Sequence, residues 1–366
     1  MQTKLPTTLG LALLGHDVVI FIFSNMAAVV RAGRFSIWLL VVNFNFSFLI
    51  GLQFRADVFQ IPQQRQALPV VRHSKTHLVK MKVRDEKLKA IIDWSKNNRD
   101  IRAVLLTSSL VNPLAPVDDF SDLDIELIFE NNAKYISDNT WTENFGNPIA
   151  MVEEDETYFE GKHAMKMVLY ADYVKVDFKL YSKPEFLLDA KKNELHEDWD
   201  IGYKVLVDKE GLTNSLKKPT HQIFIIKKPT EKKFKQVLND FWWDIAHTAK
   251  CIIRDDLFYT KFMTENNIRT DYLIPLIEWY ISSEHNWNIT TNKYGRLFKK
   301  YLTTDLWETI EQTFSGSKKN DNWDALFAMA DLVSKIGTEL SKKLNYDYPK
   351  KLEKDIRKYL DELKTK

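Results

Sequence analysis

The chain has 366 residues, of which 45% are hydrophobic and 28% are charged. A chain of this length and composition can bury the cores of two ordinary domains, which excludes both an intrinsically disordered protein and a disulfide-rich miniprotein. Its single cysteine, Cys251, can form neither an internal disulfide nor a cysteine-based zinc site, which suits a reducing compartment such as the cytoplasm. The formal net charge is +2, but acids are scarce in the first eighty residues, so residues 81–366 are mildly acidic. That balance argues against a general nucleic-acid-binding protein and leaves room for a cationic substrate.

Residues 1–80 differ in composition from everything that follows. An uncharged run from Phe35 to Phe54 is long enough to cross a bilayer as a helix at about 1.5 Å per residue. Three interpretations stay open: the run anchors the chain in a membrane, the segment is an amphipathic or buried appendage, or Met81 is the true start and the upstream residues come from a misplaced start. Membrane contact is expected only if residues 1–80 are a genuine part of the protein.

The remaining chain alternates between helical and strand patterns and then becomes helical throughout. Apolar residues recur at three- and four-residue spacings between Met81 and Asn98, which predicts a helix that starts just after Met81 and ends at Asn97-Asn98. Short apolar runs then predict buried strands at 101–106, 121–129 and 173–181. From Glu231 onward the period is helical. We therefore expect an α+β domain over residues 81–225 and a helical bundle over residues 226–366.

Three aspartates on two of these strands carry the chemistry. Because side chains alternate along a strand, Asp122 and Asp124 share one face of the second strand, and Asp177 is presented outward from the third. Carboxylate oxygens bind hard divalent cations such as Mg²⁺, and three carboxylates facing a small-residue turn are typical of two-metal phosphoryl transfer. The turn at Ser108-Ser109 has amides and hydroxyls that can hold phosphate oxygens. Taken singly, a D-x-D pattern is more often a solvated face, and a serine pair is more often a capping turn.

In this arrangement the chain resembles the aminoglycoside 6-adenylyltransferases, a branch of the DNA polymerase β-like nucleotidyltransferases. The similarity is carried by LLTSSLVN (105–112), DDFSDLDIELIF (118–129) and YVKVDFKLY (173–181), and it continues from about residue 82 to the C-terminus. The resemblance implies an N-terminal nucleotidyltransferase domain with a mixed sheet, followed by a C-terminal helical domain that binds substrate and nucleotide. It also implies the transfer of AMP from ATP to a hydroxyl of an aminoglycoside such as streptomycin, with release of pyrophosphate and with Mg²⁺ as cofactor.

Carried over residue by residue, the resemblance assigns a metal-binding and catalytic set, a nucleotide-binding set and a substrate-binding set. These are Asp122, Asp124 and Asp177 for metal and catalysis; Ser108, Ser109, Lys250, Lys293 and Arg296 for the nucleotide; and Glu154 and Asp155 for the acceptor. Two positions depart from the family, because Ser108 stands where the family has glycine and Leu110 stands where it has arginine. Glycine allows a closer approach to phosphate, and arginine is a bidentate phosphate donor, so both departures bear on activity.

The acceptor is expected to be a cationic small molecule. An acidic, aromatic-walled site suits a polycation, and the run 153–156 and the pair Asp240 and Asp244 are the acidic candidates. The general base is either Asp177 or an acid of the 153–156 run. Two alternatives stay open: a nucleotidyltransferase that acts on a protein, an RNA or another small molecule, and a nucleotide-binding pseudoenzyme. We expect ATP and the acceptor as partners, no nucleic acid, and a monomer in the cytoplasm.

Overall fold

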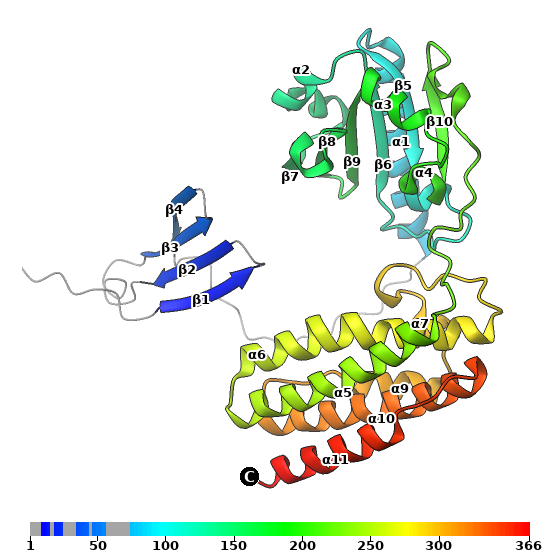
Figure 1. Ribbon diagram of the computed structural model, residues 1–366. Helices are drawn as coiled ribbons and strands as arrows, with labels where there is room; N and C mark the ends of the chain where they lie inside the picture. The colour runs from blue at the N-terminus through cyan, green and yellow to red at the C-terminus, as the bar shows by residue number, and fades with distance from the viewer. Residues whose placement is uncertain (1–8, 15–17, 25–33, 44–45, 56–73) are drawn as a thin grey trace, which may run out of the picture. The chain divides into compact units, whose positions relative to one another are not determined.

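The computed structural model describes residues 9–14, 18–24, 34–43, 46–55 and 74–366, and their side chains from Lys82 onward (Figure 1). The chain divides into two compact units, residues 1–72 and 73–366. The first unit contains one antiparallel sheet whose strands pair in chain order. These strands are β1 (Leu9–Leu14), β2 (Val18–Ser24), β3 (Arg34–Asn43) and β4 (Phe46–Arg55).

The uncharged run from Phe35 to Phe54 is divided between β3 and β4, so of the three interpretations the membrane anchor finds no support as a single helix. Its composition explains the difference, because valine, isoleucine, phenylalanine and tryptophan favour a pleated strand. Over the described part of the chain, no helix combines the length and the apolar character needed to span a bilayer.

The second unit opens with helix α1 (Ser74–Asn97). The predicted end at Asn97 is confirmed, but the helix begins at Ser74 and not just after Met81. No proline or glycine lies between Ser74 and Asn97, so nothing in the sequence interrupts the helix upstream of Met81.

A mixed six-stranded sheet follows, with strand order β10-β5-β6-β9-β8-β7. Its strands are β5 (Ile101–Thr107), β6 (Leu123–Phe129), β7 (Pro148–Glu154), β8 (His163–Tyr170), β9 (Lys175–Ser182) and β10 (Tyr203–Asp208). The predicted strands at 101–106, 121–129 and 173–181 are therefore confirmed as β5, β6 and β9. β6 and β9 pair in parallel, although about fifty residues separate them, while the other neighbours are antiparallel.

Each face of this sheet has its own core. The face that α1 covers is apolar along its length, with Leu123, Ile125 and Phe178 fully buried. The opposite face is apolar only where α3 (Lys183–Ala190) and α4 (Glu197–Ile201) pack, around Phe186 and Trp199. Beyond these helices the same face carries charged side chains, so the pleat places them at the open part of the sheet. Short turns complete this half: η2 (Ser108–Val111), α2 (Ala133–Ser137), η3 (Thr140–Phe145), η4 (Glu156–Phe159) and η5 (Leu212–Ser215).

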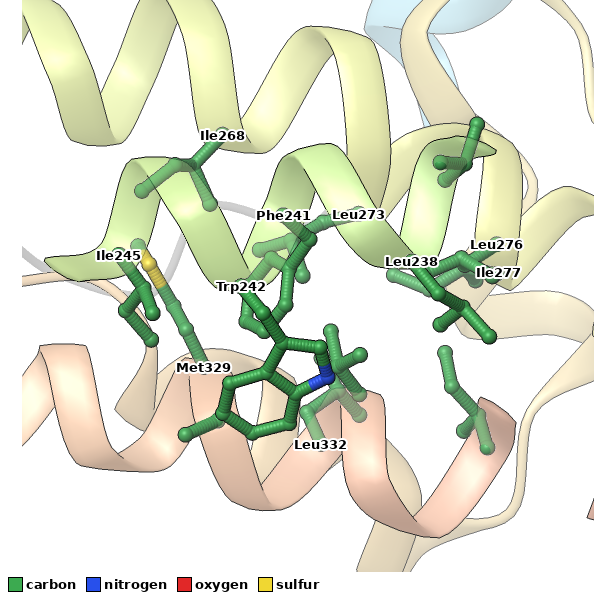
Figure 2. Packing of buried hydrophobic residues seen from close by; sticks show 14 of the residues in the cluster. Leu238, Phe241, Trp242, Ile245, Ile268, Leu273, Leu276, Ile277, Met329 and Leu332 are labelled. Atoms are coloured by element: carbon green, nitrogen blue, oxygen red, sulfur yellow. The ribbon is translucent and has the colours of Figure 1, made fainter. Parts of the chain in front are cut away.

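The C-terminal half is helical, as predicted. Its elements are α5 (Glu231–Ile253), α6 (Leu257–Lys261), the π-helix η6 (Phe262–Leu273), α7 (Ile274–Glu284), η7 (Lys293–Gly295), α8 (Phe298–Tyr301), α9 (Thr304–Gln312), α10 (Lys319–Leu344) and α11 (Lys350–Lys364). They enclose one apolar core in which Trp242 of α5 packs beside Met329 and Leu332 of α10 (Figure 2). The fold class is thus α+β, a mixed sheet followed by a helical region.

Candidate active site

A cavity of about 450 Å³ opens over the charged part of the sheet. Its walls come from the turn after β5, from β6 and β9, from the connection between sheet and bundle, and from η7. Seven of the residues singled out from the sequence line it: Ser108, Ser109, Asp122, Asp124, Asp177, Lys293 and Arg296. The tertiary fold therefore brings together side chains from segments that lie far apart along the chain.

The floor of the cavity is formed by pairs of residues that lie opposite each other on β6 and β9, and we call each such pair a rung. In the parallel register Asp124 lies directly opposite Asp177, and Glu126 lies opposite Lys179. Beside the aspartate rung, Lys175 Nζ lies 2.7 Å from Asp177 Oδ2 and 3.3 Å from Asp122 Oδ2. The central rung thus pairs two acids and is flanked on both sides by lysines.

Burial and the neighbouring Asp177 carboxylate together raise the pKa of Asp124 to about 6, while a hydrogen bond with Ser108 acts in the opposite direction. Burial also raises the pKa of Asp177, against the lowering effect of the Lys175 ammonium. Asp177 is only 9% exposed, and its Oδ1 has no hydrogen-bond partner among the described residues. Two facing carboxylates held away from water are costly unless a cation lies between them.

This donor set fits a hard divalent cation, which prefers carboxylate oxygens. The side chains are not yet gathered for coordination: among the described residues, no three His, Cys, Asp or Glu side chains lie close enough together to hold a metal ion. Asp122 and Asp177 are instead held by the Lys175 ammonium. Metal binding would therefore require this ion pair to rearrange.

The turn above the aspartates has a strained backbone. Ser108 has φ +63°, in the left-handed region that glycine adopts without steric cost. Ser109 lines the cavity beside it, whereas Leu110 packs against the apolar core of the sheet and does not line the cavity. The backbone of Gly202 packs directly against this turn: a Cβ at that position would lie only 2.7 Å from Val111 O. Leu110, at the position where the resemblance implies arginine, therefore has a packing role.

A buried network beside the aspartates was not foreseen from the sequence. Glu126 is fully buried, burial raises its pKa, and Trp199 Nε1 donates to its Oε2 over 2.6 Å. Lys179 Nζ lies 3.6 Å from Glu126 Oε1 and also forms an ion pair with Asp198. Lys179 and Asp198 both line the cavity. The alternation on β6 and β9 places Glu126 and Lys179 on the cavity face, but no local signal pointed to Trp199 or Asp198.

The helical half contributes Lys293 and Arg296, both exposed, from η7 and the residue after it. Lys250 does not line the cavity; it is exposed near the end of α5. The predicted nucleotide contact of Lys250 is therefore not supported by its position. Two tryptophans lie between Asp240 and Asp244 on α5. Trp242 is buried and Trp243 is 74% exposed.

The acidic candidates for the acceptor lie outside the cavity walls. Glu154, at the end of β7, pairs with Met165 of β8, which does line the cavity, so Glu154 lies on the same face of the sheet. Asp155 caps η4 and accepts a hydrogen bond from Thr157 N over 2.9 Å.

In the helical half, Asp244 accepts a hydrogen bond from the Tyr272 hydroxyl over 2.7 Å. Neither Asp240 nor Asp244 lines the cavity. Of the acidic candidates, Glu154 is therefore the one that shares a sheet face with the aspartates.

This chain is similar to proteins of one named family. The family model described as "Streptomycin adenylyltransferase" matches residues 81–363. Proteins named aminoglycoside 6-adenylyltransferase are similar to this chain: one from Bacillus subtilis is 27% identical over 273 residues, covering 74% of this chain and 94% of the relative. One from Campylobacter jejuni is 26% identical over 262 residues, covering 71% and 88%. A crystal structure of an aminoglycoside 6-adenyltransferase from Bacillus subtilis aligns with a TM-score of 0.39 and 23% identity, covering 77% of this chain and 99% of the other.

Proposed function

Since this chain belongs to the streptomycin adenylyltransferase family and is a nucleotidyltransferase, we propose that it transfers AMP from ATP to a hydroxyl of an aminoglycoside such as streptomycin and releases pyrophosphate. The observation that carries the proposal is the rung of Asp124 and Asp177, which faces the Ser108-Ser109 turn within one cavity. In this reaction the acceptor oxygen attacks the α-phosphorus in line, and positioning and charge neutralisation supply most of the catalysis.

The three aspartates are the metal ligands in this reaction. Asp122, Asp124 and Asp177 would hold Mg²⁺, which supplies charge neutralisation at the phosphates and at the attacking oxygen. The raised pKa of Asp124 and the unpaired Oδ1 of Asp177 support this assignment, because both carboxylates gain from a cation. The chain's own task is to keep them on neighbouring strands in a fixed register.

The nucleotide phosphates would lie between the turn and the basic residues of the cavity. Ser108 and Ser109 offer hydroxyls and amides from the turn, and Lys293 and Arg296 offer cations from the helical half. The cavity therefore offers two cations to the phosphates even though Leu110 supplies none. This favours a working enzyme over a pseudoenzyme.

The acceptor would approach from the side of β8 and β7. Glu154 lies on the cavity face of the sheet, and a carboxylate there would attract a polycation and is a candidate general base beside Asp177. The location that we propose is the cytoplasm, where ATP is available and where a free, buried Cys251 stays reduced.

The test is to incubate the purified chain with Mg²⁺, ATP and a panel of aminoglycosides, and to measure both the mass of each drug and the release of pyrophosphate. We expect one drug to gain the mass of AMP with stoichiometric pyrophosphate. Asp122→Asn and Asp177→Asn should abolish the transfer, whereas the same change at Asp138, which accepts a hydrogen bond from Thr140 N and does not line the cavity, should leave it intact. Unmodified drugs across the panel would contradict the acceptor class, and full activity of either active-site variant would contradict the metal assignment.

A further inference from the structure

The position of Lys175 is the observation that the proposed function leaves unexplained. Its ammonium lies between two of the three aspartates, 2.7 Å from Asp177 Oδ2 and 3.3 Å from Asp122 Oδ2. A surface ion pair involves one lysine and one carboxylate. Lys175 instead neutralises two carboxylates, and they are ones that a divalent cation would use.

The ammonium and a metal ion cannot share these oxygens. Mg²⁺ binds carboxylates at about 2.0–2.1 Å, and an ammonium held within hydrogen-bond distance of the same atoms would be strongly repelled by it. The Lys175 side chain is 38% exposed and lines the cavity, so it has room to leave. After leaving, it would still lie in the cavity in which the phosphates are proposed to bind.

We propose that Lys175 is a displaceable internal counter-ion, which holds Asp122 and Asp177 in the metal-free enzyme and moves to the nucleotide phosphates when a divalent cation takes the carboxylates. This inference rests on the proposed function. Its consequence is that metal and nucleotide bind cooperatively. Metal alone leaves the ammonium without a partner beside a like charge, whereas the nucleotide provides it with a new anionic partner.

Lys179, the next lysine along the same face of β9, has different partners. Lys179 is paired with Glu126 and Asp198, two acids outside the proposed metal set, and its side chain is only 16% exposed. Metal binding at the aspartates leaves its partners in place. Lys179 therefore stays a fixed charge, and Lys175 is the mobile one.

The experiment is to titrate the chain with Mn²⁺, detecting free Mn²⁺ by electron paramagnetic resonance, with and without a non-hydrolysable ATP analogue. In the wild type we expect weak Mn²⁺ binding that tightens at least about tenfold when the analogue is present, after subtraction of the Mn²⁺ that the same concentration of analogue binds without protein. Lys175→Met should bind Mn²⁺ alone about tenfold more tightly than the wild type and should lose most of the cooperativity. Its melting temperature without metal should fall, because the aspartates lose their counter-ion.

Two variants serve as controls. Lys175→Arg keeps the charge and should retain weak Mn²⁺ binding and the wild-type stability. Lys162 also forms an ion pair, with its Nζ 2.8 Å from a carboxylate oxygen of Glu160, but it does not line the cavity. Lys162→Met should therefore change neither the Mn²⁺ affinity nor the melting temperature.

Equal Mn²⁺ affinity of Lys175→Met and the wild type, or the absence of cooperativity in the wild type, would overturn the inference while the proposed function stood. No Mn²⁺ binding by the wild type even with the analogue would overturn both. If Lys175→Met fails to fold, Lys175→Gln takes its place, because it also removes the charge and should show the same tighter Mn²⁺ binding and loss of cooperativity.

Discussion

Replacing Asp124 with asparagine should stabilise the fold and abolish catalysis, and both effects have one cause. The carboxylate is desolvated on β6 and repelled by Asp177 across the rung, which raises its pKa from 3.8 to about 6. Asparagine has nearly the same shape and no charge, so it removes the repulsion. It also removes the negative charge that we propose holds the metal ion.

The size of the expected gain in stability follows from the raised pKa of Asp124. Each tenfold weakening of an acid corresponds to about 1.4 kcal/mol, so the raised pKa of Asp124 costs the ionised, metal-free protein about 3 kcal/mol. Because the folded-state pKa is the higher one, the stability that protonation of Asp124 provides is complete below about pH 4 and is lost as the pH rises through about 6. Asp124→Asn should therefore exceed the wild type by up to about 3 kcal/mol at about pH 7.5, and by less than about 1 kcal/mol near pH 4.

The assay is urea denaturation in chelator-treated buffer at several pH values. Asp138→Asn is the control, because hydrogen bonds from Thr140 lower the pKa of Asp138; there, loss of the charge should leave the stability unchanged or reduce it. Added Mg²⁺ should stabilise the wild type and leave Asp124→Asn unchanged. A variant less stable than the wild type at neutral pH, or a difference that does not narrow in acid, would refute the reasoning.

Three further predictions concern the turn, the basic wall of the cavity and the buried network. Ser108→Gly should relieve the positive φ and raise the free energy of unfolding by about 1 kcal/mol, as measured by chemical denaturation. Lys293→Ala should raise the KM for ATP about tenfold, the loss of one charge-assisted contact, whereas Lys250→Ala, outside the cavity, should leave steady-state kinetics unchanged. Trp199→Phe should lower the free energy of unfolding by about 1–3 kcal/mol, because it leaves the buried Glu126 carboxylate without its 2.6 Å donor; a neutral effect in denaturation would mean that Glu126 is satisfied in another way.

The sequence alone determined which side chains face the site along each strand. Strand alternation has a period of two residues, so Asp124 and Glu126 must share a face of β6, and Asp177 and Lys179 must share one on β9. Asp122 lies in the residue just before β6 and still lines the same cavity. The helical period after Glu231 likewise identified the bundle. These properties depend on residues a few positions apart, and local spacing is what a sequence displays.

Only the tertiary structure decided what lies opposite these side chains. The parallel pairing of β6 with β9 places Asp124 against Asp177, and Lys175 then reaches Asp177 on its own strand and Asp122 just before β6. The Trp199 donor to Glu126 lies 73 residues away along the chain. Local periodicity carries no information on such pairings, because they are selected by the packing of the whole sheet.

The same limit explains two sequence-based interpretations that the structure does not support. Polar residues in the apolar run from Phe35 to Phe54 do not recur at a spacing that would distinguish one long helix from two strands. The structure divides the run between β3 and β4. Lys250 lies on an amphipathic helix, but its position near the end of α5 keeps it outside the cavity that Lys293 lines. Composition and period determine what an element is and which face it presents, whereas the partner that meets this face is chosen by contacts between residues distant in the chain.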